Sequence, residues 1–164
     1  STFHDRLAPV TLAQAPVRQP PHIASDGGTT RAALVRYKKR LPFRLEYPSV
    51  ISSGSQLDTG YGETPVRVYK LGGQPTVRLT YRFGANQYWG IQESAWKDAP
   101  ILADKSLSQV VNGRRFDLYY NSGHLHMVVL RTGGATYWVV NSLLDELSNE
   151  TMLAIARGLR PMTR

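Results

Sequence analysis

The chain has 164 residues, no cysteine and a formal net charge of +8. This length fits one domain with a hydrophobic core of its own. The lack of cysteine excludes disulfides and thiolate metal sites, and no run of 18 apolar residues is present to span a membrane. The positive charge favours an acidic partner, such as nucleic acid, an anionic lipid surface or an acidic polymer.

The N-terminal segment differs in composition from the rest of the chain. Residues 1–28 hold four of the ten prolines and end in Ser-Asp-Gly-Gly. Such a segment extends as polyproline II or runs along another surface, and it does not form its own core. We therefore expect a Pro-rich linker or arm over residues 1–28 and a single domain over residues 29–164.

The domain is expected to begin with a helix and a strand. Residues 29–40 have helical apolar spacing, and Thr29 or Thr30 is the expected cap. Residues 41–50 alternate apolar and polar side chains, which predicts a strand, and two prolines restrict it to an edge. A polar, glycine-rich loop follows over residues 51–65.

The rest of the sheet is expected to be a meander of hairpins. Residues 66–83 read as one hairpin with its turn at Gly72-Gly73, and residues 87–94 read as the next strand. The segment 95–109 is irregular. Asn112-Gly113 is the strongest hairpin signal in the chain. It opens three apolar strands that are separated by tight-turn residues, RRFDLYYN, HLHMVVLR and ATYWVVNS.

The chain ends in an amphipathic helix. Ser148 is the expected N-cap, and Glu150 lies in the first turn, where the helix dipole favours a negative charge. The buried stripe is expected to consist of Met152, Ile155, Ala156 and Leu159, and Pro161 stops the helix. The predicted fold class is therefore α+β, an antiparallel meander-type sheet with a docked C-terminal helix and a Pro-rich N-terminal arm.

Basic and aromatic residues alternate in the middle of the chain. They are Arg67, Tyr69, Arg78, Tyr81, Arg82, Tyr88 and Trp89. Side chains of these two kinds stack on bases or sugars and pair with phosphates, although ordinary strand composition gives the same pattern. Tyr88, Trp89 and Trp96 flank the irregular segment and are the preferred pocket residues, whereas Trp138 is expected in the core.

A second group of candidate contact residues is purely basic. Arg36, Lys38, Lys39 and Arg40 follow one another with no acidic residue among them. We expect this group to face an acidic partner.

Candidates for metal binding and catalysis are weak. His124 and His126 lie two residues apart, on one face of a strand, but a third ligand is missing unless Asp117 joins from across the hairpin. The carboxylates Glu93, Asp98, Asp104, Asp145 and Glu146 are read as solvated acids rather than a catalytic pair. We therefore predict no catalytic residue, no cofactor and no metal.

The region from residue 41 to residue 160 resembles a module known from bacterial envelope proteins. The matching positions are Tyr88, Gly90, Ile91 and Gln92, then Trp96 to Leu102, then Val111 to Arg114, then Tyr137 to Asn141, and last Leu147 to Asn149 with Met152 to Ala156. In order and spacing this pattern is similar to the accessory region that follows the catalytic domain in actinobacterial LytR–CpsA–Psr proteins.

The resemblance implies a location and a functional context. Proteins of that family lie in the cell envelope, are anchored in the membrane, and transfer glycopolymers from a polyprenyl pyrophosphate carrier to peptidoglycan. Their transferase activity belongs to a separate, larger α/β domain, and no segment of this chain matches its residues. The resemblance therefore implies an extracytoplasmic domain, anchored by a segment outside this chain, with no catalytic residue of its own.

Three hypotheses follow. The first is a non-catalytic accessory domain of cell-wall glycopolymer assembly, which contacts a protein partner, a wall polysaccharide or an anionic lipid surface. The second is the C-terminal piece of a LytR–CpsA–Psr transferase. The third, ranked last, is a basic nucleic-acid-binding domain. The sequence does not indicate the oligomeric state.

Overall fold

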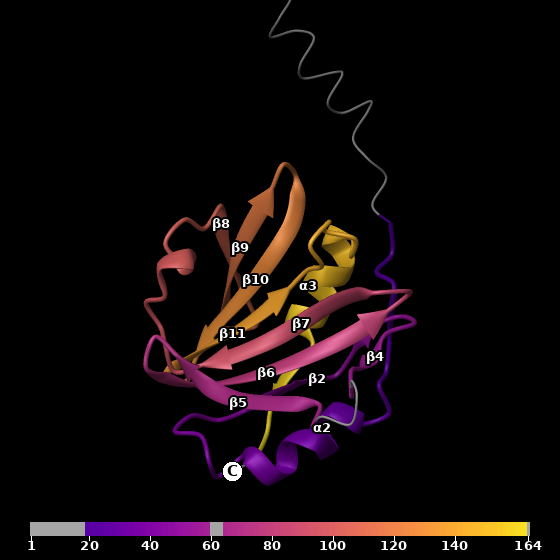
Figure 1. Cartoon of the computed structure of the whole chain (residues 1–164). Coiled ribbons are helices and arrows are strands. Elements are labelled where there is room, and N and C mark those ends of the chain that lie inside the picture. The colour runs from indigo at the N-terminus through magenta and orange to yellow at the C-terminus, as the bar shows by residue number, and fades with distance from the viewer. Residues whose placement is uncertain (1–18, 60–63, 164) are drawn as a thin grey trace, which may run out of the picture.

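The computed structural model describes residues 19–59 and 64–163, and it is mostly β (Figure 1). Its main element is an eight-stranded antiparallel sheet in the order β4-β6-β7-β11-β10-β9-β8, with β5 also paired to β6. The strands are β4 (Gln56–Leu57), β5 (Val66–Leu71), β6 (Gln74–Phe83), β7 (Gln87–Ser94), β8 (Leu107–Val111), β9 (Arg114–Asn121), β10 (His124–Thr132) and β11 (Ala135–Val140). The predicted antiparallel sheet is confirmed.

The hairpin turns lie where their sequences predict them. Between β8 and β9, Asn112 and Gly113 have φ values of 51° and 76°. Between β5 and β6, Gly72 and Gly73 have φ values of 57° and 78°. Positive φ at both central residues defines the type I′ turn, whose twist matches that of the strands it joins.

The C-terminal helix α3 (Asn149–Arg157) packs against β10 and β11, as predicted. The Ser148 hydroxyl accepts a hydrogen bond from the backbone N–H of Thr151, so the expected cap is confirmed. The helix is shorter than predicted. Gly158 closes it by donating to the carbonyls of Ala154 and Ile155, and the strand β12 (Leu159–Pro161) follows and pairs with β2 (Glu46–Pro48).

The segment before β2 also differs from its prediction. Only Glu46–Pro48 of residues 41–50 is a strand, because β12 is too short to pair with more of it. The predicted alternation holds as far as Leu45, since Leu41, Phe43 and Leu45 are buried. It fails within β2, where Glu46 is buried and Tyr47 is half-buried.

The N-terminal helix is capped by a residue that the sequence reading missed. The helix α2 (Thr29–Leu34) continues into the short 3-10 helix η1 (Val35–Tyr37). The Asp26 carboxylate accepts from the backbone N–H groups of Gly28 and Thr30. The predicted cap by Thr29 or Thr30 is wrong, because Gly28 is at the N-cap position and both threonines lie inside the helix. The Thr29 hydroxyl donates to the carbonyl of Asp26, and the Thr30 hydroxyl is buried at 2.6 Å from that of Tyr81.

Part of the predicted arm belongs to the packed structure. The strand β1 (Ile23–Ala24) pairs with β3 (Ile51–Ser52), and the backbone N–H of His22 donates to the Thr151 hydroxyl. Residues 22–28 therefore pack with the domain. Residues 1–18 lie outside the described range.

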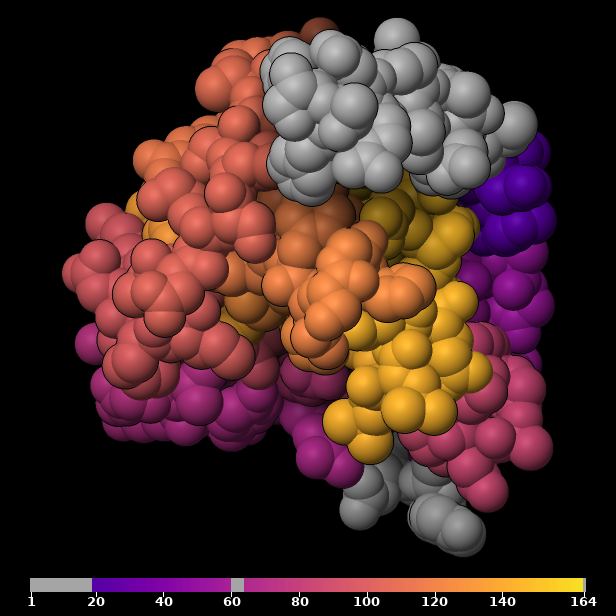
Figure 2. All heavy atoms as spheres, turned by 90° about the horizontal axis from the view of Figure 1, so that it is seen from above, coloured from indigo at the N-terminus to yellow at the C-terminus, as the bar shows by residue number. Residues whose placement is uncertain are grey.

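The two faces of the sheet are covered differently. The inner face packs under α3 and the segments around β1 to β3. A segment that contains the 3-10 helix η2 (Pro100–Leu102) lies on the side opposite α3 (Figure 2). It buries a second apolar cluster on the outer face, made of Ala99, Leu102, Tyr119, Met127, Val129 and Trp138. Over β5 and β6 and the start of β7, the outer face instead carries exposed polar and aromatic side chains.

Candidate functional site

The candidate site is the half of the outer face over β5, β6 and the start of β7, which the segment around η2 does not cover. Side chains alternate along a strand, so residues two apart share a face. Pairing of Arg78 with Gln92 and of Arg82 with Tyr88 places these residues on the outer face. We name the following set the basic–aromatic face: Arg67, Tyr69, Arg78, Thr80, Arg82 and Tyr88.

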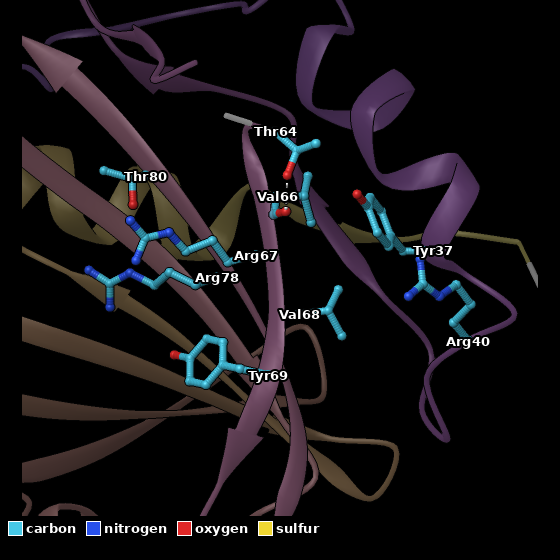
Figure 3. A pocket seen from close by; sticks show the side chains of 9 residues that line it. All are labelled: Tyr37, Arg40, Thr64, Val66, Arg67, Val68, Tyr69, Arg78 and Thr80. Carbon is cyan, nitrogen blue, oxygen red and sulfur yellow. Dashed lines mark hydrogen bonds between the residues drawn. The ribbon is translucent and has the colours of Figure 1, made fainter. Parts of the chain in front are cut away.

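Two arginines lie directly opposite each other on this face. Arg67 of β5 and Arg78 of β6 are cross-strand partners in the register. Their guanidinium groups lie side by side and extend toward Thr80 (Figure 3). Like charges in directly opposed positions destabilise a sheet, and an anion bound between them would relieve the repulsion.

Arg78 lies in a position that glycine makes available. A Cβ atom added at Gly90 would be 2.9 Å from Nη2 of Arg78 and 3.1 Å from its Cζ. The guanidinium therefore occupies the space that a side chain at position 90 of β7 would fill. Burial lowers the pKa of Arg78; the nearby Tyr69 opposes this shift, and the charge of Arg67 adds to it. Arg78 donates no side-chain hydrogen bond to any residue that the structure describes.

Two tyrosines lie on the same face. The Tyr69 hydroxyl donates to Oε1 of Gln92 at 2.7 Å, which fixes its ring beside Arg78. Burial raises the pKa of Tyr69 and outweighs the two arginines, so the hydroxyl stays protonated at neutral pH. Tyr69 and Tyr88 are 36% and 42% exposed, so their rings offer flat surfaces to a sugar or a base.

The face is hollowed at the edge strand β5. A cavity of about 830 Å³ extends around β5. Its lining includes Arg67, Arg78 and Tyr69 on one side of this strand, and Tyr37 and Arg40 on the other side (Figure 3). A smaller cavity of about 240 Å³ shares Arg67 and Thr80 with it and extends to Tyr88, with Asp58 in its lining. Together they form a shallow groove, open to solvent.

The predicted contact residues are divided among several places. Tyr88 lies on the basic–aromatic face, and Arg40 lines the larger cavity, where its guanidinium covers the Tyr37 ring at 5.1 Å. Arg36, Lys38 and Lys39 do not line that cavity. The strand register explains the position of Tyr88 alone, since the four basic residues lie in η1 and directly after it.

Trp89 is buried, in contrast to its predicted role at a pocket. It is 1% exposed, stacks on Tyr81 with ring centroids 4.2 Å apart, and donates from Nε1 to the Ser55 hydroxyl. As the neighbour of Tyr88 on a strand, it points to the opposite, inner face. Trp89 is therefore a core residue and is withdrawn as a contact residue.

Trp96 is not part of the basic–aromatic face. It is half-buried against the second apolar cluster, and its ring covers Gly72 so closely that a Cβ there would be 2.8 Å from it. Trp138, expected in the core, is 6% exposed within the same cluster. The irregular segment covers one half of the sheet. It also lines a cavity of about 360 Å³ together with Arg115 and Arg131, and Trp96 does not line that cavity.

The two histidines do not converge with further ligands. His126 lies at a bulge in β10, with Nδ1 2.6 Å from a carboxylate oxygen of Asp145. Asp117 is buried and bonded to Ser108, Arg115 and Arg131. Within residues 19–59 and 64–163, no three His, Cys, Asp or Glu side chains are placed to hold a metal ion.

Glu93 is buried and not solvated as predicted. One carboxylate oxygen accepts from the backbone N–H of Glu46, and the other has no hydrogen-bond partner among the described residues. Burial raises the pKa of Glu93 well above its ordinary value, and the nearby Glu46 adds to the shift. Glu46 itself pairs with Arg114 at 2.7 Å. Glu93 continues the inner-face series of Trp89 and Ile91, which is why it enters the core.

Comparison of the chain with protein-family models, curated proteins and solved structures gives no match. No helix in the described part of the chain is long and apolar enough to cross a membrane. The geometry itself supports binding of an anion by paired guanidinium groups, next to aromatic rings, on an open sheet face.

Proposed function

We propose that this protein is a non-catalytic, extracytoplasmic accessory domain of cell-envelope glycopolymer assembly, and that its basic–aromatic face binds an anionic wall polymer. The observation that carries the proposal is the cross-strand pair Arg67 and Arg78, two like charges in direct opposition beside an open groove.

The chemistry of the face fits such a polymer. A phosphate or carboxylate group placed between two guanidinium groups accepts several charge-assisted hydrogen bonds. The exposed rings of Tyr69 and Tyr88 suit the apolar faces of sugar units on either side of the anion. The net charge of +8 attracts a polyanion over a longer range. The resemblance to LytR–CpsA–Psr proteins supplies the envelope location.

Two other functions remain as alternatives. If the chain is the C-terminal piece of a LytR–CpsA–Psr transferase, the same face would hold the polymer while chemistry takes place in another domain. If the ligand is single-stranded nucleic acid, the tyrosines would stack on bases and the arginines would pair with phosphates. The arginine pair serves all three hypotheses, so the experiment has to compare ligands.

The test is co-sedimentation of Arg78→Gln with purified cell wall. We expect at least a fivefold loss of binding, with a melting temperature equal to or slightly above that of the wild type, because a repulsive pair is removed. Arg44→Gln is the matched control. It removes the same charge from an exposed position before β2 that belongs to neither the basic–aromatic face nor the edge at β8.

Three outcomes decide between the ligands. A loss confined to Arg78→Gln supports a specific site for the wall polymer. An equal loss in both variants means that only net charge matters and contradicts the site. Displacement of the wall polymer by equimolar single-stranded DNA contradicts the envelope hypothesis and supports the nucleic-acid alternative.

A further inference from the structure

The sheet ends at β8 with an unpaired edge. Among the strands that the structure describes, β8 pairs only with β9. The residues that flank a two-residue hairpin turn form a hydrogen-bonded pair, here Val111 and Arg114. Hydrogen-bonded and non-hydrogen-bonded pairs alternate along an antiparallel ladder, so the backbone N–H and C=O groups of Ser108 and Val110 point away from β9.

This edge lacks the protection that sheet edges usually have. Natural edge strands carry charged residues that prevent pairing with other chains. β8 reads Leu-Ser-Gln-Val-Val and contains no charge, while Val110 is 72% exposed and Leu107 is 44% exposed. The edge strand β5, in contrast, carries Arg67 and Lys70. Of the two edges, β8 is the one suited to accept another strand.

The charges around β8 indicate what kind of strand it accepts. Arg115 is the cross-strand partner of Val110, Arg157 donates to the side chain of Gln109 at 3.0 Å, and Lys105 precedes the strand. The acidic groups nearby are Asp104, which is exposed, and Asp117, which is buried between Arg115 and Arg131. Cations therefore outnumber acids along this edge. A second copy of the chain would bring the same cations against it, whereas an acidic strand would be attracted.

We propose that β8 binds an extended, acidic segment of a partner protein as an added strand of the sheet. The outward backbone groups of Ser108 and Val110 form the main-chain hydrogen bonds, as in other cases of strand addition. Val110 and Leu107 contact apolar side chains on the two faces of the added strand. Arg115 and Arg157 pair with its carboxylates. This proposal is independent of the basic–aromatic face, which lies at the other end of the sheet.

The test is an NMR titration of the full chain with the capped peptide Glu-Val-Thr-Val-Glu-Val-Glu. We expect shifts in the amide signals of residues 106–119, at the edge and in β9 behind it. The same peptide with lysine in place of glutamate should bind at least tenfold more weakly. Val110→Pro removes one outward N–H without breaking a bond to β9, and it should weaken binding of the acidic peptide at least tenfold.

Val68→Pro is the matched control. Val68 on β5 and Val77 on β6 form a non-hydrogen-bonded pair, so the N–H of Val68 also points outward from the sheet. The variant Val68→Pro should bind the acidic peptide like the wild type. Val110→Glu keeps the N–H but adds a negative charge that repels the acidic peptide, and its at least fivefold loss tests the proposal even if the proline variant does not fold.

Several results would overturn the proposal. One is an absence of shifts in β8 and β9 at saturating peptide, and another is equal binding of the acidic and basic peptides. A third is a doubled mass of the wild-type chain in sedimentation equilibrium that Val110→Lys abolishes, since β8 would then pair with a second copy.

Discussion

Tyr88 and Trp89 are neighbours in sequence but belong to two different surfaces. Trp89 lies on the inner face, stacked on Tyr81 and 1% exposed. Tyr88 lies on the outer face and is 42% exposed. The same strand therefore supplies the core with one side chain and the candidate site with the next. The difference teaches that substitutions on the two faces should separate stability from binding.

The largest expected effect is that of removing an inner-face aromatic ring. Trp89→Ala should lower the free energy of unfolding by about 3–5 kcal/mol, because a large buried side chain leaves a cavity. Tyr88→Ala should change stability by less than about 0.5 kcal/mol and weaken wall binding. Urea denaturation of both variants checks the contrast. Similar losses of stability would show that the two faces are not energetically distinct.

Asp117 tests whether the covered half of the outer face is structural. Asp117→Asn should destabilise the fold by about 3 kcal/mol, because it leaves Arg115 and Arg131 without their buried counter-charge. Burial acts to raise the pKa of Asp117, but hydrogen bonds from Ser108, Arg131 and Arg115 outweigh it and lower the pKa. Its stabilisation is thus present above the ordinary aspartate pKa and is lost as the pH falls through the lowered value.

The measurement for Asp117→Asn is urea denaturation at pH 7 and pH 2. The difference from the wild type should be full at pH 7 and much smaller at pH 2. A difference that does not depend on pH would mean that packing, and not the ionised carboxylate, stabilises this half of the face.

The smallest expected effect concerns Glu93, the buried carboxylate on the inner face. The folded-state pKa of Glu93 is raised, so stability is fully present below the ordinary glutamate pKa and is lost as the pH rises through the raised value. Glu93→Gln keeps the acceptor for the backbone N–H of Glu46 and removes the charge. It should match the wild type at pH 4 and be more stable by about 1 kcal/mol at pH 8.

Thermal unfolding of Glu93→Gln between pH 4 and pH 8 checks this prediction. A wild-type melting temperature that does not fall relative to that of the variant across this range would show that Glu93 does not take up a proton on folding.

Local signals in the sequence predicted the parts of the fold that depend on short-range chemistry. Asn112-Gly113 fixed a type I′ turn, and Ser148 capped α3. Of residues 41–50 only Glu46–Pro48 form a strand. Alternation does not indicate whether a partner strand exists. The pairing of β2 with β12 joins segments more than 100 residues apart, and no local pattern encodes it.

The candidate site was predicted in composition but not in geometry. The alternating basic and aromatic residues contained both Arg78 and Tyr88, together with the buried Tyr81 and Trp89. Because side chains alternate along a strand, counting every second residue separates the outer-face residues Arg78 and Tyr88 from the buried Tyr81 and Trp89. The same count places Glu93 with Trp89 on the inner face. The segment around η2 covers one half of the outer face and leaves the other half open. The spacing of apolar and polar residues does not predict where this segment packs.

The pairing of β12 with β2 also has a consequence for the order in which the chain folds during synthesis. The backbone N–H of Met162 donates to the carbonyl of Leu45, and Arg114 bonds at once to Glu46 and to the carbonyl of Leu159. The part of the core around β2 is therefore closed by residues that are made more than 100 positions later. Contacts so distant in sequence form slowly. A nascent chain of this protein stays incompletely folded until β12 has left the ribosome.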